Sequence, residues 1–318
     1  MTVAIVGAGA IGSLVGARLA RAGEDVILIA RGAHLRAVQA GGVTVTGRDE
    51  EIHVDVVATD DVTAIRGADV VFITLKAHAI PAVAPAIGRS LRHDAVVIGA
   101  MNGIPWWYFR DRHLESVDPG GVIAASIPYE QVIGSVVYQA ARLVVPGVVE
   151  HEEGDRFSLG EPDGPKTDRV RALARMLSAA GFKAPVQTRI RHEIWLKLIG
   201  NATLNPVSAI TRATMGEIFP AEDSRHLVRT LMEEVASVAN AYDVELPLTI
   251  EKRMQGAAAM GGHKTSMLQD LEAGKRLETD ALLGAVIELA EAREIDVPSL
   301  RELYVLTKLA ESVALAKG

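Results

Sequence analysis

The chain contains no cysteine among its 318 residues. This absence excludes disulfide bridges, catalytic thiolates and metal sites with thiolate ligands. The nine histidines are scattered along the sequence, and none of them forms the close pair that a zinc site uses. We therefore expect a protein without a bound metal ion.

Long hydrophobic runs and basic stretches are also missing. The two longest runs without a charged residue are residues 1–17 and 95–109, both shorter than the ~20 residues of a membrane-spanning helix. The formal net charge is −7 and no basic stripe is visible, which argues against a nucleic-acid partner. No basic segment precedes the first apolar run, so we expect a cytoplasmic protein that does not enter a membrane.

Short β-branched runs alternate with helical patterns in the first part of the chain. This alternation predicts an α/β fold with a mainly parallel sheet in the N-terminal domain. The predicted strands are residues 3–6, 26–30, 54–58, 68–75 and 95–100, and the first helix is residues 11–22. Three further strands, at residues 134–141, 143–151 and 156–160, are interpreted as antiparallel additions to this sheet, followed by a helix at 168–180.

Strand patterns nearly vanish after about residue 188, where the periodicity becomes helical. The predicted helices are residues 193–204, 206–214, 225–240, 266–273, 279–293 and 299–317. The sequence therefore predicts two domains with a cleft between them. The first is an α/β domain over residues 1–188, and the second is a C-terminal all-α domain over residues 189–318.

A glycine motif stands between the first predicted strand and the first predicted helix. It consists of Gly7, Ala8, Gly9, Ala10, Ile11 and Gly12. In this context the first glycine makes a tight turn, the second lets the backbone approach a pyrophosphate, and the third allows close packing of the helix. The strand–turn–helix context favours a dinucleotide site over a glycine-rich turn that binds nothing.

The end of the second strand indicates which nicotinamide cofactor binds. An enzyme that uses NAD usually has an acidic residue there, whereas this chain has Arg31, with Arg36 nearby. A guanidinium group can pair with the 2′-phosphate of NADPH, so we expect NADPH unless Arg31 is only a solvated loop residue. Lys76 and Asn102 also follow strands and would face the same crevice, although a solvated lysine and a turn are the ordinary alternatives.

One predicted helix carries three polar residues on one side. Lys197, Asn201 and Asn205 are spaced i, i+4 and i+8 within an otherwise apolar segment. A lysine beside two carboxamides in such a segment indicates a polar cavity or a ligand. Each residue also has an ordinary interpretation: a solvated lysine, a helix-end asparagine, and an N-cap with Pro206 at the start of a new helix.

Ser266 and Glu278 form the second polar group of the C-terminal region. On one unbroken helix these residues would lie ~120° apart at 3.6 residues per turn. A break at residues 274–276 would free them to converge, but periodicity cannot show that they do.

With these residues the chain resembles the ketopantoate reductase family from end to end. The motifs that carry the resemblance are the glycine motif, Arg31, residues 74–76, 102–103, 193–206 and 266–270, and Glu278. The resemblance implies a Rossmann domain joined to a helical domain, with NADPH bound to the first. It implies that Lys197 is the general acid and that Asn102 and Lys76 line the nicotinamide side. Asn201, Asn205, Ser266 and Glu278 would hold the substrate, and Glu278 would also keep Lys197 protonated.

Three functions are therefore open. The leading hypothesis is NADPH-dependent reduction of 2-dehydropantoate, a small 2-oxo acid, to pantoate in pantothenate biosynthesis. The second is a paralogue that reduces a different 2-oxo acid. Trp106 and Trp107 favour it, because residues 104–109 are unusually aromatic for the family, and Leu277 and Thr279 also depart from the usual pattern around Glu278. The third is an NADP-binding sensor without catalysis. The sequence leaves the oligomeric state open, with a homodimer as one alternative.

Overall fold

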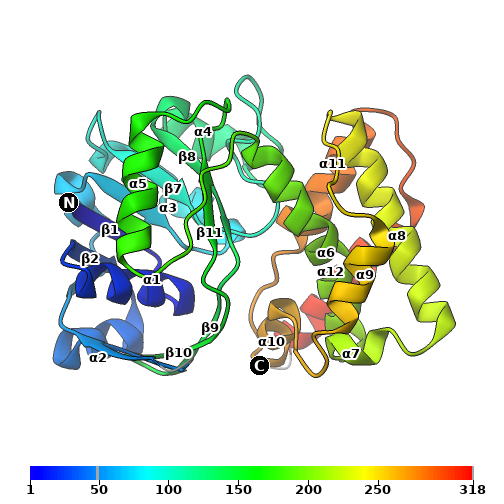
Figure 1. Ribbon diagram of the computed structural model, residues 1–318, viewed down its shortest axis with the longest axis horizontal. Coiled ribbons are helices and arrows are strands. Elements are labelled where there is room, and N and C mark those ends of the chain that lie inside the picture. The colour runs from blue at the N-terminus through cyan, green and yellow to red at the C-terminus, as the bar shows by residue number, and fades with distance from the viewer. Residues whose placement is uncertain (48–49, 317–318) are drawn as a thin grey trace. The chain divides into compact units, whose positions relative to one another are not determined.

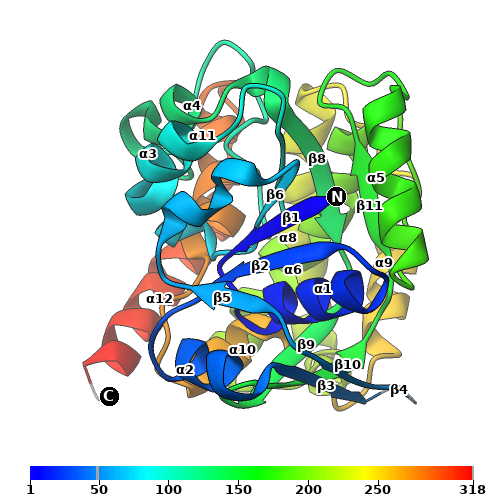
Figure 2. The ribbon, with the colours of Figure 1, turned by 90° about the vertical axis from the view of Figure 1, so that its left-hand side faces the viewer.

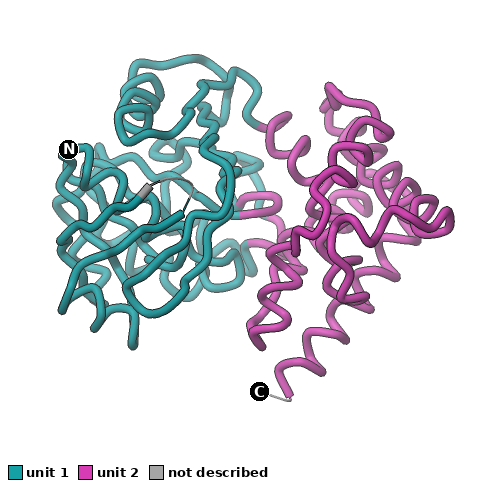
Figure 3. Tube along the Cα trace, turned by 60° about the horizontal axis from the view of Figure 1, so that its bottom comes forward, with its two compact units in different colours: residues 1–101, 106–113, 118–190 teal, residues 102–105, 114–117, 191–318 magenta. Residues whose placement is uncertain are grey.

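The chain divides into two compact units, and each of them is built from three separate stretches of the sequence (Figure 3). A computed structural model describes residues 1–47 and 50–316. The first unit comprises residues 1–101, 106–113 and 118–190, and the second comprises residues 102–105, 114–117 and 191–318. Residues 102–105 and 114–117 therefore belong to the C-terminal unit, although the residues on either side of each segment belong to the first unit.

A twisted sheet with helices packed on it forms the frame of the first unit (Figure 1). Its seven strands are in the order β11-β8-β7-β6-β1-β2-β5. The strands are β1 (Thr2–Val6), β2 (Asp25–Ile29), β5 (Val57–Thr59), β6 (Val70–Ile73), β7 (Val96–Gly99), β8 (Val132–Val137) and β11 (Phe157–Gly160). All neighbours are parallel except β11, which is antiparallel to β8. The predicted parallel sheet is confirmed, but the interpretation of β8 as an antiparallel addition was wrong.

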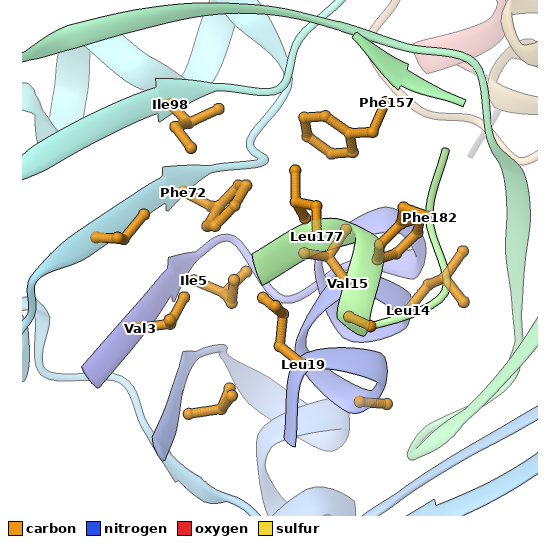
Figure 4. Packing of buried hydrophobic residues seen from close by; sticks show 14 of the residues in the cluster. Val3, Ile5, Leu14, Val15, Leu19, Phe72, Ile98, Phe157, Leu177 and Phe182 are labelled. Carbon is orange, nitrogen blue, oxygen red and sulfur yellow. The ribbon is translucent and has the colours of Figure 1, made fainter. Parts of the chain in front are cut away.

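Helices cover this sheet and close its core. The α-helices are α1 (Ala10–Arg21), α2 (Gly32–Gly41), α3 (Ile80–Ser90), α4 (Val122–Ser126) and α5 (Asp168–Ala179). Four short 3₁₀ helices join them: η1 (Val62–Gly67), η2 (Ala77–Ala79), η3 (Pro119–Gly121) and η4 (Tyr129–Gln131). Leu14 and Leu19 of α1 lie in the core with Ile5, Phe72 and Phe157 (Figure 4). Full burial of a side chain of this size contributes about 1.5–3 kcal/mol, so this core fixes α1 on the sheet.

A second, four-stranded sheet lies on the other side of α1 (Figure 2). It contains β3 (Val43–Gly47), β4 (Glu50–Val54), β9 (Ala140–Val145) and β10 (Val148–Glu153), in the order β4-β3-β10-β9. The strand predicted at residues 143–151 is interrupted by a turn at Gly147, whose φ of +85° favours glycine. The prediction that residues 143–151 extend the main sheet was wrong, because β10 pairs with β3 instead. The strand predicted at residues 156–160 does extend the main sheet, as β11 antiparallel to β8.

Helices make up the second unit. They are α6 (Ile190–Thr211), α7 (Met215–Ile218), α8 (Glu222–Ala241), α9 (Ile250–Ala258), α10 (Ser266–Glu272), the π-helical turn η5 (Asp280–Gly284), α11 (Ala285–Glu291) and α12 (Pro298–Leu315). The helices α7 and α9 were not predicted. The end of the helix predicted at residues 299–317 lies partly outside the described residues.

The helix α6 runs without interruption through Pro206, so the predicted break into two helices was wrong. A proline inside a helix removes one hydrogen bond and costs ~3 kcal/mol or more. Leu204, Val207 and Ala209 around it are buried, and their burial offsets this cost. Because the helix is continuous, Lys197, Asn201 and Asn205 do lie on one helix at the spacing read from the sequence.

Candidate functional site

The glycine loop of the first unit joins β1 to α1, and its three glycines have different surroundings. Gly7 has a φ of +99°, and a Cβ atom there would lie 2.9 Å from the backbone nitrogen of Leu75. A Cβ atom on Gly12 would lie 2.5 Å from the hydroxyl of Thr74. By contrast, a Cβ atom on Gly9 would meet only one carbonyl oxygen, at 3.9 Å. Gly7 and Gly12 are therefore required by packing, whereas the space beside Gly9 is open.

The start of α1 is suited to an anion. Ala10, Ile11 and Gly12 are its first residues, and their N–H groups have no acceptor within the helix. No side chain caps this end, and its first turn contains no acidic residue. The partial positive charge of the helix end and the open space beside Gly9 fit the pyrophosphate of a dinucleotide.

Thr74 and Lys76 flank this loop from the neighbouring strand β6. The Thr74 hydroxyl donates a hydrogen bond to the carbonyl oxygen of Gly7, over 2.7 Å. Lys76 is half-buried and forms the N-cap of η2, directly after the carboxyl end of β6. The sequence placed Lys76 at this edge of the sheet, and the fold puts it one strand away from the glycine loop.

Arg31 follows β2, the strand on the other side of β1. It is exposed and forms the N-cap of α2. The carbonyl oxygen of Ile29, two residues earlier, accepts hydrogen bonds from the N–H groups of Gly7 and Ala8. The backbone before Arg31 is thus tied directly to the glycine loop, and no acidic residue occurs between Ala30 and Gly41.

Three polar side chains of the second unit are joined by hydrogen bonds. The ammonium group of Lys197 donates a hydrogen bond to Oδ1 of Asn102, over 2.8 Å. The same amide donates from Nδ2 to Oε2 of Glu278, over 3.2 Å. One carboxamide therefore joins the cation to the carboxylate, although the three residues come from distant parts of the sequence. Lys197 is half-buried, and Glu278 is only 6% exposed.

The position of Asn102 depends on the glycine that follows it. Gly103 has a φ of +85°, and a Cβ atom there would lie 2.2 Å from the carbonyl oxygen of Ala281. The N–H group of Ile104 donates to that same oxygen over 3.1 Å. The segment 102–104 is thus docked by its backbone on the segment 278–281, which brings the side chains of Asn102 and Glu278 together.

The segment that carries Glu278 is held on α12 from both sides. The carboxylate of Glu311 accepts a hydrogen bond from the N–H group of Leu277, over 2.9 Å. Asp280 accepts one from the hydroxyl of Tyr304, over 2.8 Å, and pairs with Lys308. Burial, together with the carboxylate of Asp280, raises the pKa of Tyr304 to about 12, so its hydroxyl stays a donor.

The backbone is also irregular at this point, because Asp280 begins a π-helical turn. Such turns are common at functional sites. The prediction of a regular helix from residue 279 was therefore wrong over Asp280–Gly284. Sequence reasoning also missed Glu311 and Tyr304, since nothing in their own helix indicates that they hold the segment of Glu278.

The other predicted substrate residues also lie in the second unit. Asn201 is half-buried and Asn205 is 8% exposed, both on α6 beyond Lys197. Among the described residues we find no protein hydrogen bond to either amide, which leaves their donors and acceptors available. Ser266 is exposed in the first turn of α10, where Thr265 is the cap.

Trp106 and Trp107 belong to the first unit and are buried there, at 3% and 2% exposed. The ring of Trp106 covers Gly99 at the end of β7, and a Cβ atom on that glycine would lie 2.7 Å from it. The ring of Trp107 covers Gly134 of β8 in the same way, at 2.6 Å. Their surroundings favour a packing role over the selection of substrate.

Comparison with known proteins identifies the family. A model described as ketopantoate reductase PanE/ApbA matches residues 3–164, and the C-terminal model of that family matches residues 189–311. The chain belongs to the ketopantoate reductase family. It is 42% identical to the 2-dehydropantoate 2-reductase of Mesorhizobium japonicum over 316 residues, which cover 97% of each chain. This ketopantoate reductase family member is therefore an oxidoreductase that uses a nicotinamide cofactor.

Solved structures of the ketopantoate reductase family have the same fold. The PanE/ApbA family ketopantoate reductase from Ralstonia eutropha matches with a TM-score of 0.87 and 32% identity, over 99% of both chains. A D-mandelate dehydrogenase solved with NADH and anilino(oxo)acetate matches with a TM-score of 0.86, over 99% of both chains. Its identity is only 23%, so this likeness concerns the fold.

Two further features bear on the site of this reductase. Within residues 1–47 and 50–316, histidines and acidic residues form no cluster that could hold a metal ion. In the same part of the chain no helix combines the length and the apolar character needed to cross a membrane.

Proposed function

We propose that this ketopantoate reductase family member reduces 2-dehydropantoate to pantoate, with NADPH as the hydride donor. The observation that carries the proposal is the chain of hydrogen bonds from Lys197 through Asn102 to Glu278. It holds a cation in place, and a cation stabilises the negative charge that reduction of a ketone places on the oxygen. When bound, NADPH supplies the hydride.

Lys197 would act on the ketone oxygen. Addition of hydride to the carbon leaves negative charge on that oxygen, which then needs a proton. An ammonium group has three N–H donors, and Asn102 uses one of them. A protonated Lys197 beside the ketone would stabilise the developing alkoxide and transfer the proton from Nζ to the oxygen.

Asn102 and Glu278 would keep this lysine in place. A carboxylate can only accept, so Glu278 takes its hydrogen bond from the amide nitrogen of Asn102, which turns Oδ1 of that amide toward Lys197. The negative charge of Glu278, one amide away, also favours the protonated form of the lysine. Asn201 and Asn205 each provide a donor and an acceptor for a hydroxylated 2-oxo acid, and Ser266 provides a hydroxyl for its carboxylate.

The preference for NADPH over NADH would come from Arg31. Its guanidinium group lies exposed beyond β2, where a dinucleotide on the glycine loop has its adenosine ribose. We expect NADPH to bind at least roughly tenfold more tightly than NADH, or ~1.4 kcal/mol. Titration of both cofactors into wild type, Arg31→Ala and the exposed control Arg89→Ala tests this. If Arg31→Ala still binds NADPH over NADH as selectively as wild type, another residue binds the 2′-phosphate.

The burial of the residues that depart from the family pattern supports 2-dehydropantoate as the substrate. Leu277 is 3% exposed, and Trp106 and Trp107 are equally buried, so none of these side chains offers a surface to a ligand. The assay is the oxidation of NADPH, followed optically with 2-dehydropantoate and a panel of other 2-oxo acids. A larger kcat/KM for another acid would favour the paralogue, and no turnover of any acid would favour the sensor.

We also propose that the chain forms a homodimer through α12. Its exposed side carries apolar side chains that are 44–63% exposed: Val305, Leu306, Leu309 and Val313. The charged residues of this stretch, Lys308 and Glu311, turn instead toward Asp280 and the backbone of Leu277. A surface helix normally has the opposite arrangement.

A second copy of the chain fits this apolar stripe. A two-fold axis would place the stripe against itself, and its uncharged side chains bring no like charges together. Size-exclusion chromatography with light scattering should show a dimer that Leu309→Glu converts to a monomer. Val57→Glu, at an exposed valine of β5 in the other unit, is the matched control. A monomeric wild type would refute the proposal.

The cytoplasmic location predicted from the sequence stays a prediction, which cell fractionation would test.

A further inference from the structure

His34 joins two segments of the first unit through both of its ring nitrogens. It is half-buried in the first turn of α2, three residues after Arg31. Its Nε2 atom lies 3.0 Å from the hydroxyl of Ser13 on α1. The N–H group of Gly147, in the turn between β9 and β10, donates to Nδ1 over 3.1 Å. One imidazole thus connects three parts of the chain that are far apart in sequence.

The directions of these hydrogen bonds follow from the partners. A backbone N–H group can only donate, so Nδ1 carries no proton and accepts. The proton of the neutral ring is then on Nε2, which donates to the oxygen of Ser13. Ser13 in turn donates to the carbonyl oxygen of Ala8, over 3.3 Å. Burial lowers the pKa of His34 and so favours this neutral form.

This chain of hydrogen bonds ends in the cofactor motif. Ala8 lies between Gly7 and Gly9, and the N–H group of Ser13 donates to the carbonyl oxygen of Gly9 over 2.9 Å. At the other end, the carbonyl oxygen of Arg31 accepts the N–H group of Leu35, which belongs to the same turn as His34. The imidazole therefore fixes the start of α2 relative to the glycine loop.

We propose that His34 is a positioning residue that holds the 2′-phosphate segment at Arg31 in register with the pyrophosphate loop. The inference rests on the proposed use of NADPH and adds a residue that does not itself touch the cofactor. A dinucleotide spans both segments, so a loose connection weakens its binding. It weakens NADPH more than NADH, because only the 2′-phosphate depends on the place of Arg31.

The main test is His34→Phe, which keeps a planar ring but removes both hydrogen bonds. We expect its affinity for NADPH to fall about tenfold and its NADPH-to-NADH preference to fall at least threefold, while kcat at saturating NADPH stays within twofold. His34→Gln, whose side-chain amide can still donate to Ser13, should recover most of the affinity. The matched control is His53→Phe, an exposed histidine that hydrogen-bonds to Thr44 in the second sheet of the same unit.

A double-mutant cycle shows whether His34 acts through Ser13. If it does, Ser13→Ala weakens NADPH binding as His34→Phe does, and the double variant is little worse than either one. Fully additive losses would overturn the connection. If wild type prefers NADPH and a folded His34→Phe keeps both the NADPH affinity and that preference, the role of His34 is wrong while the proposed cofactor stands. A wild type without any preference would overturn the proposed cofactor and this inference together.

Discussion

Replacement of Lys197 by methionine tests the proposed chemistry most directly. Methionine keeps most of the aliphatic length of lysine but loses the ammonium group, so the packing of α6 should change little. A positioned general acid contributes ~10²–10⁴-fold to the rate. We therefore expect kcat to fall by this factor, which corresponds to roughly 2.7–5.4 kcal/mol in the activation free energy.

The effect on stability should be much smaller. The variant loses the hydrogen bond from Lys197 to Asn102, and a bond to a charged group is worth ~1.5–3 kcal/mol when buried. Lys197 is only half-buried, which reduces this value. For a protein of this size we expect Tm to fall by no more than about 5 °C.

The assay measures kcat, the Kd for NADPH and Tm on one preparation of each variant. The Kd should stay within about twofold of wild type, because the glycine motif and Arg31 belong to the other unit. Lys252→Met, at an exposed lysine of α9, is the matched control and should leave all three quantities unchanged. If Lys197→Met is folded and has near-normal kcat, Lys197 is not the acid and the proposed mechanism is wrong.

Three further predictions concern the surroundings of the site. Gly103→Ala should lower kcat roughly tenfold or more at an unchanged NADPH Kd, because its Cβ would lie 2.2 Å from the carbonyl oxygen of Ala281 and displace Asn102. Steady-state kinetics and cofactor titration measure the two quantities, and an unchanged kcat would contradict this prediction. The free energy of unfolding should fall as the pH drops below about 6.5, the ordinary pKa of histidine, toward the lowered pKa of His34, because in this window the unfolded chain binds a proton that the folded one does not. Denaturant titrations at several pH values should show a shallower fall in His34→Gln, and identical slopes would mean that other groups cause it. Trp107→Ala should lower the free energy of unfolding by ~3–5 kcal/mol, because it leaves a cavity beside Gly134. If instead the stability is unchanged and the ranking of 2-oxo acids as substrates changes, Trp107 contributes to the choice of substrate.

The sequence by itself determined the features that depend on local backbone geometry. The glycine motif is recognisable because a strand, a tight turn and a helix follow one another within a few residues. The alignment of Lys197, Asn201 and Asn205 follows from the helical period alone, and it holds because α6 continues through Pro206. In both cases the neighbours along the chain are also the neighbours in space.

Only the tertiary structure decided how the polar residues meet. Asn102 is separated from Lys197 by 95 positions and from Glu278 by 176, and no local period relates such residues. Their contact depends on the docking of the Gly103 backbone at Ala281. The connection from Ser13 through His34 to Gly147 likewise requires the second sheet, whose pairing of β10 with β3 no strand pattern indicated. Periodicity records which side of an element is buried, whereas the partner on that side is selected by packing and hydrogen bonding across the folded chain.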